Sequence, residues 1–282
     1  MKLKHLFLYL ACFFSFSLMA QEPDSLQLQM NLPLGETIEQ QYSIQMELEM
    51  ENSNSILGNL SFNLQYEVVE TSDSEYTLSC LPTFFQLSTI MEGNIKKIRT
   101  AEIPVAAGDQ GILCTCSSTG KILEIQGQDD FLEKLQQLFA SGTVEDNGHR
   151  AQGNFSEELI NNQLYVILNA ISAFQDHCPN FPVYEGLCID GQIDFKEMGF
   201  QIPNNTEISF QLECLERTDG ITLLGKKVAI GPYGNANFLY WIEEKTGWLN
   251  EGIASFEMSF SGQNGPVKSL KVELSSEKVS PN

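Results

Sequence analysis

The chain has few of the residues that enzymes use for acid–base or nucleophilic catalysis. Of its 3 histidines, only His149 and His177 lie beyond the first twenty positions. The sequence contains no GxSxG nucleophile elbow, HExxH zinc motif, P-loop or GxGxxG loop. We therefore expect a protein that is not an enzyme and that uses no cofactor and no metal. Paired carboxylates such as Asp129-Asp130 leave a carbohydrate-active hydrolase as a remote alternative, because glycoside hydrolysis needs two acidic side chains.

Basic residues are also scarce. The chain has 16 Lys and Arg against 37 Asp and Glu, which gives a formal net charge of −21. A protein this acidic repels phosphate backbones, so we expect no nucleic-acid partner. Solubility outside the cytoplasm explains the charge more simply than an acidic catalytic surface.

Long apolar runs are missing except at the start of the chain. Lys2 and Lys4 precede an uncharged run from Leu6 to Met19, LFLYLACFFSFSLM, and Ala20-Gln21 follows it. The run is shorter than the roughly 20 residues that a membrane-spanning helix needs. This pattern is typical of a secretory signal peptide over residues 1–20, with cleavage between Ala20 and Gln21.

A signal peptide implies that the protein is exported, and there is one alternative for how the N-terminal segment is processed. We expect a periplasmic or extracellular protein whose mature chain has no transmembrane segment. The alternative is a lipid anchor on Cys12, which the small residue Ala11 precedes. Cleavage there would split the apolar run and leave FFSFSLM next to the anchor, so we favour simple cleavage.

The cysteine count is consistent with an oxidising compartment. Of 7 cysteines, all but Cys12 lie beyond the signal peptide, which leaves an even number for disulfide formation. Cys178 and Cys188 bracket the short loop PNFPVYEGL, and they are the candidate disulfide. The alternative is that both are small buried residues. Cys114 and Cys116 are two residues apart, so on a strand their thiols point to the same side.

Alternation of apolar and polar residues predicts β-strands in two regions. Residues 21–127 form an N-terminal antiparallel region, in which runs such as Tyr42 to Met50 and Leu60 to Val68 have one apolar face. Residues 179–282 form a C-terminal antiparallel region, with turns at Asp219-Gly220 and Thr246-Gly247. The two regions could be related halves or parts of one compact domain.

Helical periodicity interrupts the strands in residues 128–178. One amphipathic helix spans about Phe131 to Phe139, and a longer one runs from Phe155 to about His177, with a polar loop from Thr143 to Gly153 between them. A cationic His177 would suit the end of the second helix. The predicted fold class is α+β, mainly β: curved antiparallel sheets or an open half-barrel, with two inserted amphipathic helices.

The mature N-terminus resembles a family of uncharacterised exported proteins of Bacteroidota. Leu28 to Thr37, LQMNLPLGET, precedes a Met- and Glu-rich alternating strand, and Phe181-Pro182 and Thr246-Gly247 match the later turn motifs of that family. The sequence departs from the family at Gly186 to Ile189, where a Gly-Asp-x-Trp segment is expected. The resemblance implies an exported β-rich fold with no established activity.

One possible modification site goes with this resemblance. Asp24-Ser25-Leu26 is similar to the Asp-Ser/Thr-apolar sites at which Bacteroidota attach O-glycans to exported proteins. Ser25 is therefore a candidate O-glycosylation site.

Two classes of function fit these features. The long strands with Met, Phe and Leu on one face favour a non-enzymatic binding or carrier protein of the bacterial envelope, with an apolar small molecule as its ligand. The alternative is a structural module that binds an envelope protein through its acidic surface or an edge strand. Alternation alone does not show whether the apolar face is a filled core or a ligand site.

Overall fold

The structure is a computed structural model that describes residues 24–50, 55–72, 74–91, 94–99, 111–140, 142–146, 149–152, 157–174, 177–192, 208–232, 234–259 and 267–279. The predicted signal-peptide residues Ala20 and Gln21, and Cys12, lie outside this part of the chain. The described elements are β1 (Thr37–Met50), β2 (Ser55–Thr71), β3 (Glu75–Met91), β4 (Asn94–Arg99), β5 (Ile112–Ser117), β6 (Ile122–Gln126), α2 (Gln128–Ala140), β7 (Thr143–Asp146), β8 (His149–Gln152), α3 (Glu157–Ala173), β9 (Cys188–Gln192), β10 (Ile208–Thr218), β11 (Ile221–Ile230), β12 (Gly234–Glu243), β13 (Leu249–Ser259) and β14 (Val267–Lys278).

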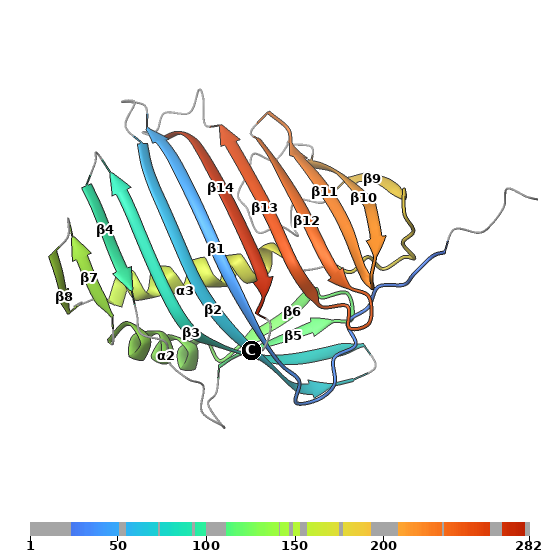
Figure 1. The fold of residues 1–282 in the computed structure, drawn as a ribbon, viewed down its shortest axis with the longest axis horizontal. Coiled ribbons are helices and arrows are strands. Elements are labelled where there is room, and N and C mark those ends of the chain that lie inside the picture. Colours follow the sequence, from blue (N-terminus) through green and yellow to red (C-terminus); the bar gives the residue numbers. More distant parts are fainter. Residues whose placement is uncertain are drawn as a thin grey trace, which may run out of the picture.

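The strands form one large antiparallel sheet (Figure 1). Their order is β8-β7-β4-β3-β2-β1-β14-β13-β12-β11-β10-β9. The described strands leave the sheet open, with β8 and β9 at its two ends. The first long strand, β1, pairs with the last, β14, so the two predicted strand regions are joined at the middle of a single sheet. This confirms the mainly β, antiparallel fold class.

The alternation of the sequence explains which side of the sheet is apolar. In β2 the side chains of Leu60, Phe62, Leu64, Tyr66 and Val68 are all buried, and the residues between them are more exposed. Successive side chains of a strand point to opposite faces. We call the side that carries these buried residues the inner face and the opposite side the outer face.

Strand β3 divides the sheet into two branches. Its first part, Glu75 to Cys80, pairs with β5, whereas Gln86 to Met91 pairs with β4. Pro82 lies between these two segments and has no N–H to donate to a ladder. The β5–β6 hairpin branches from the large sheet at β3, and Figure 1 shows it at one end of the long strands.

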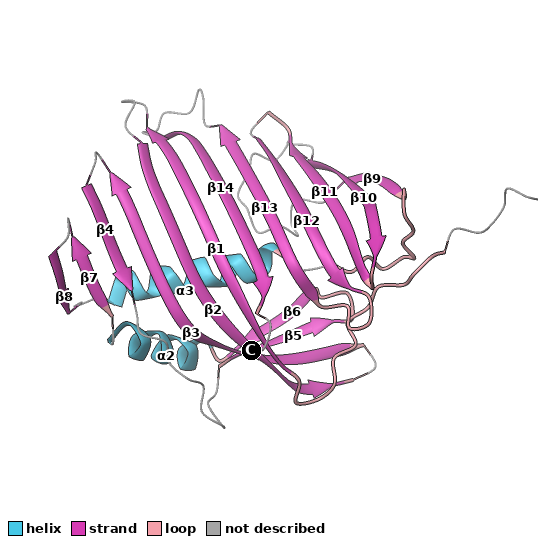
Figure 2. Cartoon of the chain, viewed as in Figure 1, coloured by secondary structure: helices cyan, strands magenta, loops and turns pink. Residues whose placement is uncertain are grey.

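Both helices cover the inner face, and α3 crosses it (Figure 2). The ring of Phe139 in α2 lies 4.8 Å from that of Phe85 in β3. Just beyond α3, the ring of Phe174 lies 6.4 Å from that of Tyr240 in β12. The two predicted helices are thus confirmed as core elements. Among the described residues, no helix has the length and apolar character required to cross a membrane.

The predicted loop from Thr143 to Gly153 is wrong over most of its length. Thr143–Asp146 and His149–Gln152 are the short strands β7 and β8, which extend the sheet through pairing of β7 with β4. Backbone hydrogen bonds at a sheet edge need no apolar side chains. A polar hairpin at the sheet edge therefore lacks the alternation of apolar and polar residues from which the other strands were predicted.

Candidate functional site

Along the central strands, the inner-face side chains change from buried to partly exposed. Phe62, Tyr42 and Ser276 lie next to one another on β2, β1 and β14, and all three are buried. Met46 lies on the same face of β1, four residues after Tyr42, and it is 41% exposed. Apolar and polar residues alternate along the whole of β1. The difference in exposure between Tyr42 and Met46 therefore comes from the elements that pack on the strand.

The partly exposed inner-face residues form a continuous surface. We call it the open apolar face, and it consists of Ile44, Met46, Leu48, Ile56, Phe256, Met258, Leu270 and Val272. Direct cross-strand pairing links its members. Met46 pairs with Val272, and Val272 pairs with Phe256. Gly58 lies beside Met46 on β2 and adds no side chain, which leaves the methionine accessible.

Phe174 marks the covered end of the inner face. A Cβ atom on Gly252 of β13 would lie 2.7 Å from the Phe174 ring, so the glycine allows the aromatic side chain to rest on the sheet. The contact fixes the C-terminal end of α3 against β13 and β12. The open apolar face begins beyond it.

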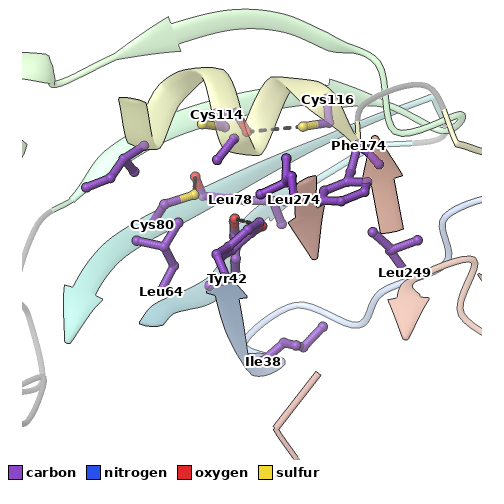
Figure 3. Close-up of a cluster of buried hydrophobic side chains, with 14 of the residues drawn as sticks. Ile38, Tyr42, Leu64, Leu78, Cys80, Cys114, Cys116, Phe174, Leu249 and Leu274 are labelled. Atoms are coloured by element: carbon purple, nitrogen blue, oxygen red, sulfur yellow. Dashed lines mark hydrogen bonds between the residues drawn. The ribbon is translucent and has the colours of Figure 1, made fainter. Parts of the chain in front are cut away.

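Under α3 the covered end contains a small cavity of about 60 Å³. Its walls include Tyr42, Tyr66, Cys114, Cys116, His177 and Trp248. In the close-up of Figure 3, Tyr42, Cys80 and Leu78 lie below the helix, and Cys114 and Cys116 overlap it. The cavity is thus part of the packed core between the sheet, the β5–β6 hairpin and α3.

Polar groups near this cavity bond to one another. The Tyr42 and Tyr66 hydroxyls are 2.7 Å apart. Burial raises the pKa of both phenols above the usual value for tyrosine, so both remain neutral at physiological pH. Gln40 accepts from Trp248 Nε1 at 3.1 Å and donates to Ser276 Oγ at 2.8 Å. The network links the strands to the β12–β13 turn.

The predicted helix end at about His177 is wrong, because α3 ends at Ala173 and His177 lies beyond it. His177 nevertheless contacts the chain just after the helix and also reaches a second element. Its Nδ1 is 3.0 Å from the carbonyl oxygen of Phe174, and its Nε2 is 3.0 Å from that of Gly247. The ring therefore joins the helix terminus to the β12–β13 turn. His149, in contrast, is exposed in β8.

The structure does not form the candidate disulfide between Cys178 and Cys188. The Cys178 thiol is buried and donates to the Gly247 carbonyl oxygen at 3.4 Å, whereas the exposed Cys188 thiol donates to Glu213 Oε1 at 3.8 Å. Neither thiol is in a disulfide bond in the structure, and the two ends of the loop lie in different surroundings. The alternative of a small buried residue fits Cys178 and not Cys188.

The other cysteine prediction is confirmed. Cys114 and Cys116 are both buried on the same side of β5, close to Cys80 of β3. Burial raises the pKa of the Cys116 thiol to about 12 and that of Cys80 well above its usual range. Thiols in this protonated state are poor nucleophiles.

A second, polar groove of about 350 Å³ lies at the β10–β11 turn, and sequence reasoning did not identify it. Arg217 Nε donates to Glu244 Oε1 at 2.9 Å, and Thr222 Oγ1 donates to the same oxygen at 2.8 Å. The hydrogen bond from Arg217 holds the pKa of the Glu244 carboxyl below its usual range. Arg217 also donates to the Asp24 carbonyl oxygen, so the groove attaches the N-terminal segment to the sheet.

The remaining predicted site residue is exposed. Ser25 follows Asp24 at the rim of this groove, and the next residue, Leu26, pairs with Val183 in an isolated bridge. O-glycosylation of Ser25 stays a prediction. Within the part of the chain that the structure describes, no group of three or more His, Cys, Asp or Glu side chains is arranged to hold a metal ion.

Three solved structures share parts of this arrangement. A structure of lipid–protein interactions in lipovitellin has a TM-score of 0.47 and 9% identity, covering 89% of this chain and 26% of that one. An outer membrane channel from Pseudomonas putida F1 has a TM-score of 0.25 and 7% identity, covering 89% and 97%. A β-barrel-like protein with a domain of unknown function from Brucella abortus has a TM-score of 0.24 and 10% identity, covering 89% and 100%.

These similarities are too distant to transfer a function. The chain spans about a quarter of the length of lipovitellin. No known family matches the chain, and no curated protein matches it. The class that its own fold and site define is an open antiparallel β protein with a partly covered apolar face.

Proposed function

We propose that this protein binds an apolar ligand on the open apolar face and acts as a carrier for it. The observation that carries the proposal is the 41% exposure of Met46 on the face that elsewhere forms the core. A contiguous apolar surface left open on a folded domain is typical of a binding site. Its members come from β1, β2, β13 and β14, so the site lies at the middle of the sheet.

The small cavity under α3 does not compete with this site. Its volume of about 60 Å³ is well below the roughly 300–1,000 Å³ that ligand pockets usually have. Its polar lining groups already hydrogen-bond to one another. The open apolar face, by contrast, offers Met, Leu, Ile, Val and Phe side chains, which suit an apolar ligand.

Met46 and Leu57 offer a matched pair for testing the proposal. Leu57 on β2 is 38% exposed, close to the 41% of Met46 on the neighbouring strand. It pairs with Glu47 and so lies on the outer face, whereas Met46 lies on the inner face. Aspartate at either position adds the same charge at similar exposure.

Met46→Asp is expected to weaken binding of the neutral fluorophore N-phenyl-1-naphthylamine at least about tenfold, because ligand binding would desolvate the new carboxylate. Leu57→Asp is expected to leave the affinity within about twofold. Fluorescence titration of the wild type and both variants measures the effect, and circular dichroism checks their folding. Equal losses in the two variants, or a wild type without saturable binding, would contradict the proposal.

A further inference from the structure

Met46 is the most exposed of the methionines whose exposure the structure describes. It is 41% exposed, whereas Met30, in the segment before β1, is buried, and Met50 and Met258 are partly buried. The thioether sulfur of methionine reacts with oxidants, and solvent exposure lets an oxidant reach it. On the open apolar face, Met46 is therefore the residue that an oxidant should modify first.

The side chain of Met46 is surrounded by apolar residues. Its cross-strand neighbours are Val272 of β14 and Gly58 of β2, and Ile44 and Leu48 lie two positions away on the same face of β1. The terminal methyl carbon of Met46 lies 3.5 Å from the position that a Cβ atom on Gly58 would occupy. The thioether thus rests over a residue that has no side chain. An oxygen atom added to this sulfur would stand among apolar groups in the proposed ligand site.

We propose that Met46 is a redox modification site: oxidation to methionine sulfoxide by a peroxide releases the ligand, and enzymatic reduction of the sulfoxide restores binding. This rests on the proposed function and adds a means of regulating the same site. Sulfoxide formation converts a flexible apolar side chain into a polar one, and methionine sulfoxide reductases reverse it.

The oxidation is an oxygen-atom transfer. One oxygen of hydrogen peroxide bonds to the Met46 sulfur while the O–O bond breaks, and its proton passes to the departing hydroxide, which leaves as water. The sulfur loses two electrons and the peroxide gains them. In the reverse direction, two thiols of a reductase become a disulfide, the S–O bond breaks and the oxygen leaves as water.

The exposure of Met46 separates an effect on binding from an effect on folding. In the protein without ligand, the sulfoxide oxygen stays hydrated, because the side chain is already partly in solvent. An apolar ligand on this face would remove that water and offer no hydrogen bond in return, which is costly for a polar group. Oxidation should therefore lower ligand affinity about tenfold and leave the protein folded.

Peptide mass spectrometry and fluorescence titration test the two parts of the proposal separately. The wild type, Met46→Leu and Met258→Leu are treated with hydrogen peroxide, desalted, and incubated with dithiothreitol to reverse sulfenic acid and disulfide formation. Mass spectrometry of the wild type should find Met46 oxidised before Met258 and Met30. The affinity of the wild type for N-phenyl-1-naphthylamine should fall about tenfold on treatment. Reductases for both sulfoxide epimers should restore it, whereas dithiothreitol alone should not.

Met258→Leu is the matched control, because Met258 lies on the same face and is less exposed than Met46. Each protein is compared with itself before and after treatment, so an effect of the substitution on the starting affinity cancels. Met258→Leu should lose affinity on oxidation as the wild type does. Met46→Leu should change by less than about twofold.

Several results would overturn the inference and leave the proposed function intact. These are oxidation of Met30 or Met258 as fast as Met46, complete oxidation of Met46 without loss of affinity, and an equal loss in Met46→Leu. Unfolding of the oxidised wild type, seen by circular dichroism, would also overturn it. A wild type that shows no saturable binding before treatment would instead contradict the proposed function itself.

Discussion

Replacing Gly247 by alanine is expected to lower the free energy of unfolding by about 2–5 kcal/mol. Gly247 has φ +64°, and a Cβ atom there would lie 2.1 Å from the carbonyl oxygen of Gln29. The obstacle is backbone, so it cannot move aside as a flexible side chain would. The turn also accepts hydrogen bonds from Asn31 N at 2.7 Å and from the Cys178 thiol, so its displacement disturbs several elements.

Gly220 provides the control for the Gly247 variant. It has a similar φ of +77°, but nothing lies within 4 Å of the position of its Cβ atom. Gly220→Ala should therefore show only the cost of the left-handed backbone conformation, about 1–2 kcal/mol. Urea unfolding of both variants measures the difference. Equal destabilisation by the two substitutions would show that the β12–β13 turn is not packed against the N-terminal segment.

Phe62→Ala is expected to destabilise the protein by about 3–5 kcal/mol, the usual cost of removing a fully buried aromatic side chain. The ring is completely buried at the centre of the sheet, and it stacks on Tyr42 with centroids 4.9 Å apart. Its removal leaves a cavity that β-pairing to β1 and β3 prevents from collapsing.

The matched control is Leu57→Ala on the same strand, because Leu57 is on the outer face and partly exposed. It should change stability by no more than about 0.5–1 kcal/mol. Chemical denaturation followed by tryptophan fluorescence gives both values. A loss below about 1 kcal/mol for Phe62→Ala would mean that this end of the inner face is not a packed core.

The sequence predicted the strands and helices because their signals are local. Alternation from Tyr42 to Met50 is enough to predict β1, and Asp219-Gly220 does form a turn in which both residues have positive φ. The pairing of β1 with β14 has no such signal, since it joins residues more than 200 positions apart. The alternating pattern shows which face of a strand is buried, but backbone hydrogen bonds are the same for any partner strand, so the sequence does not show which strands pair.

The candidate site was harder to predict, because its defining property is the partial exposure of one part of the inner face. Tyr42 and Met46 occupy equivalent positions in the same alternating run, yet one is buried and the other is exposed. The path of α3 makes the difference, and sequence periodicity does not show where a helix crosses a sheet.

Photo-crosslinking locates the ligand and so tests the central claim most directly. A long-chain alcohol with a terminal diazirine is suitable, because it tests binding to the apolar face independently of any headgroup. Irradiation followed by peptide mass spectrometry should place the label on inner-face residues such as Met46, Phe256 and Val272, and excess unlabelled alcohol should prevent it. Labelling mainly at the outer-face residues Leu57 and Ile253, or labelling that unlabelled alcohol does not reduce, would contradict the assignment of the open apolar face as the binding site.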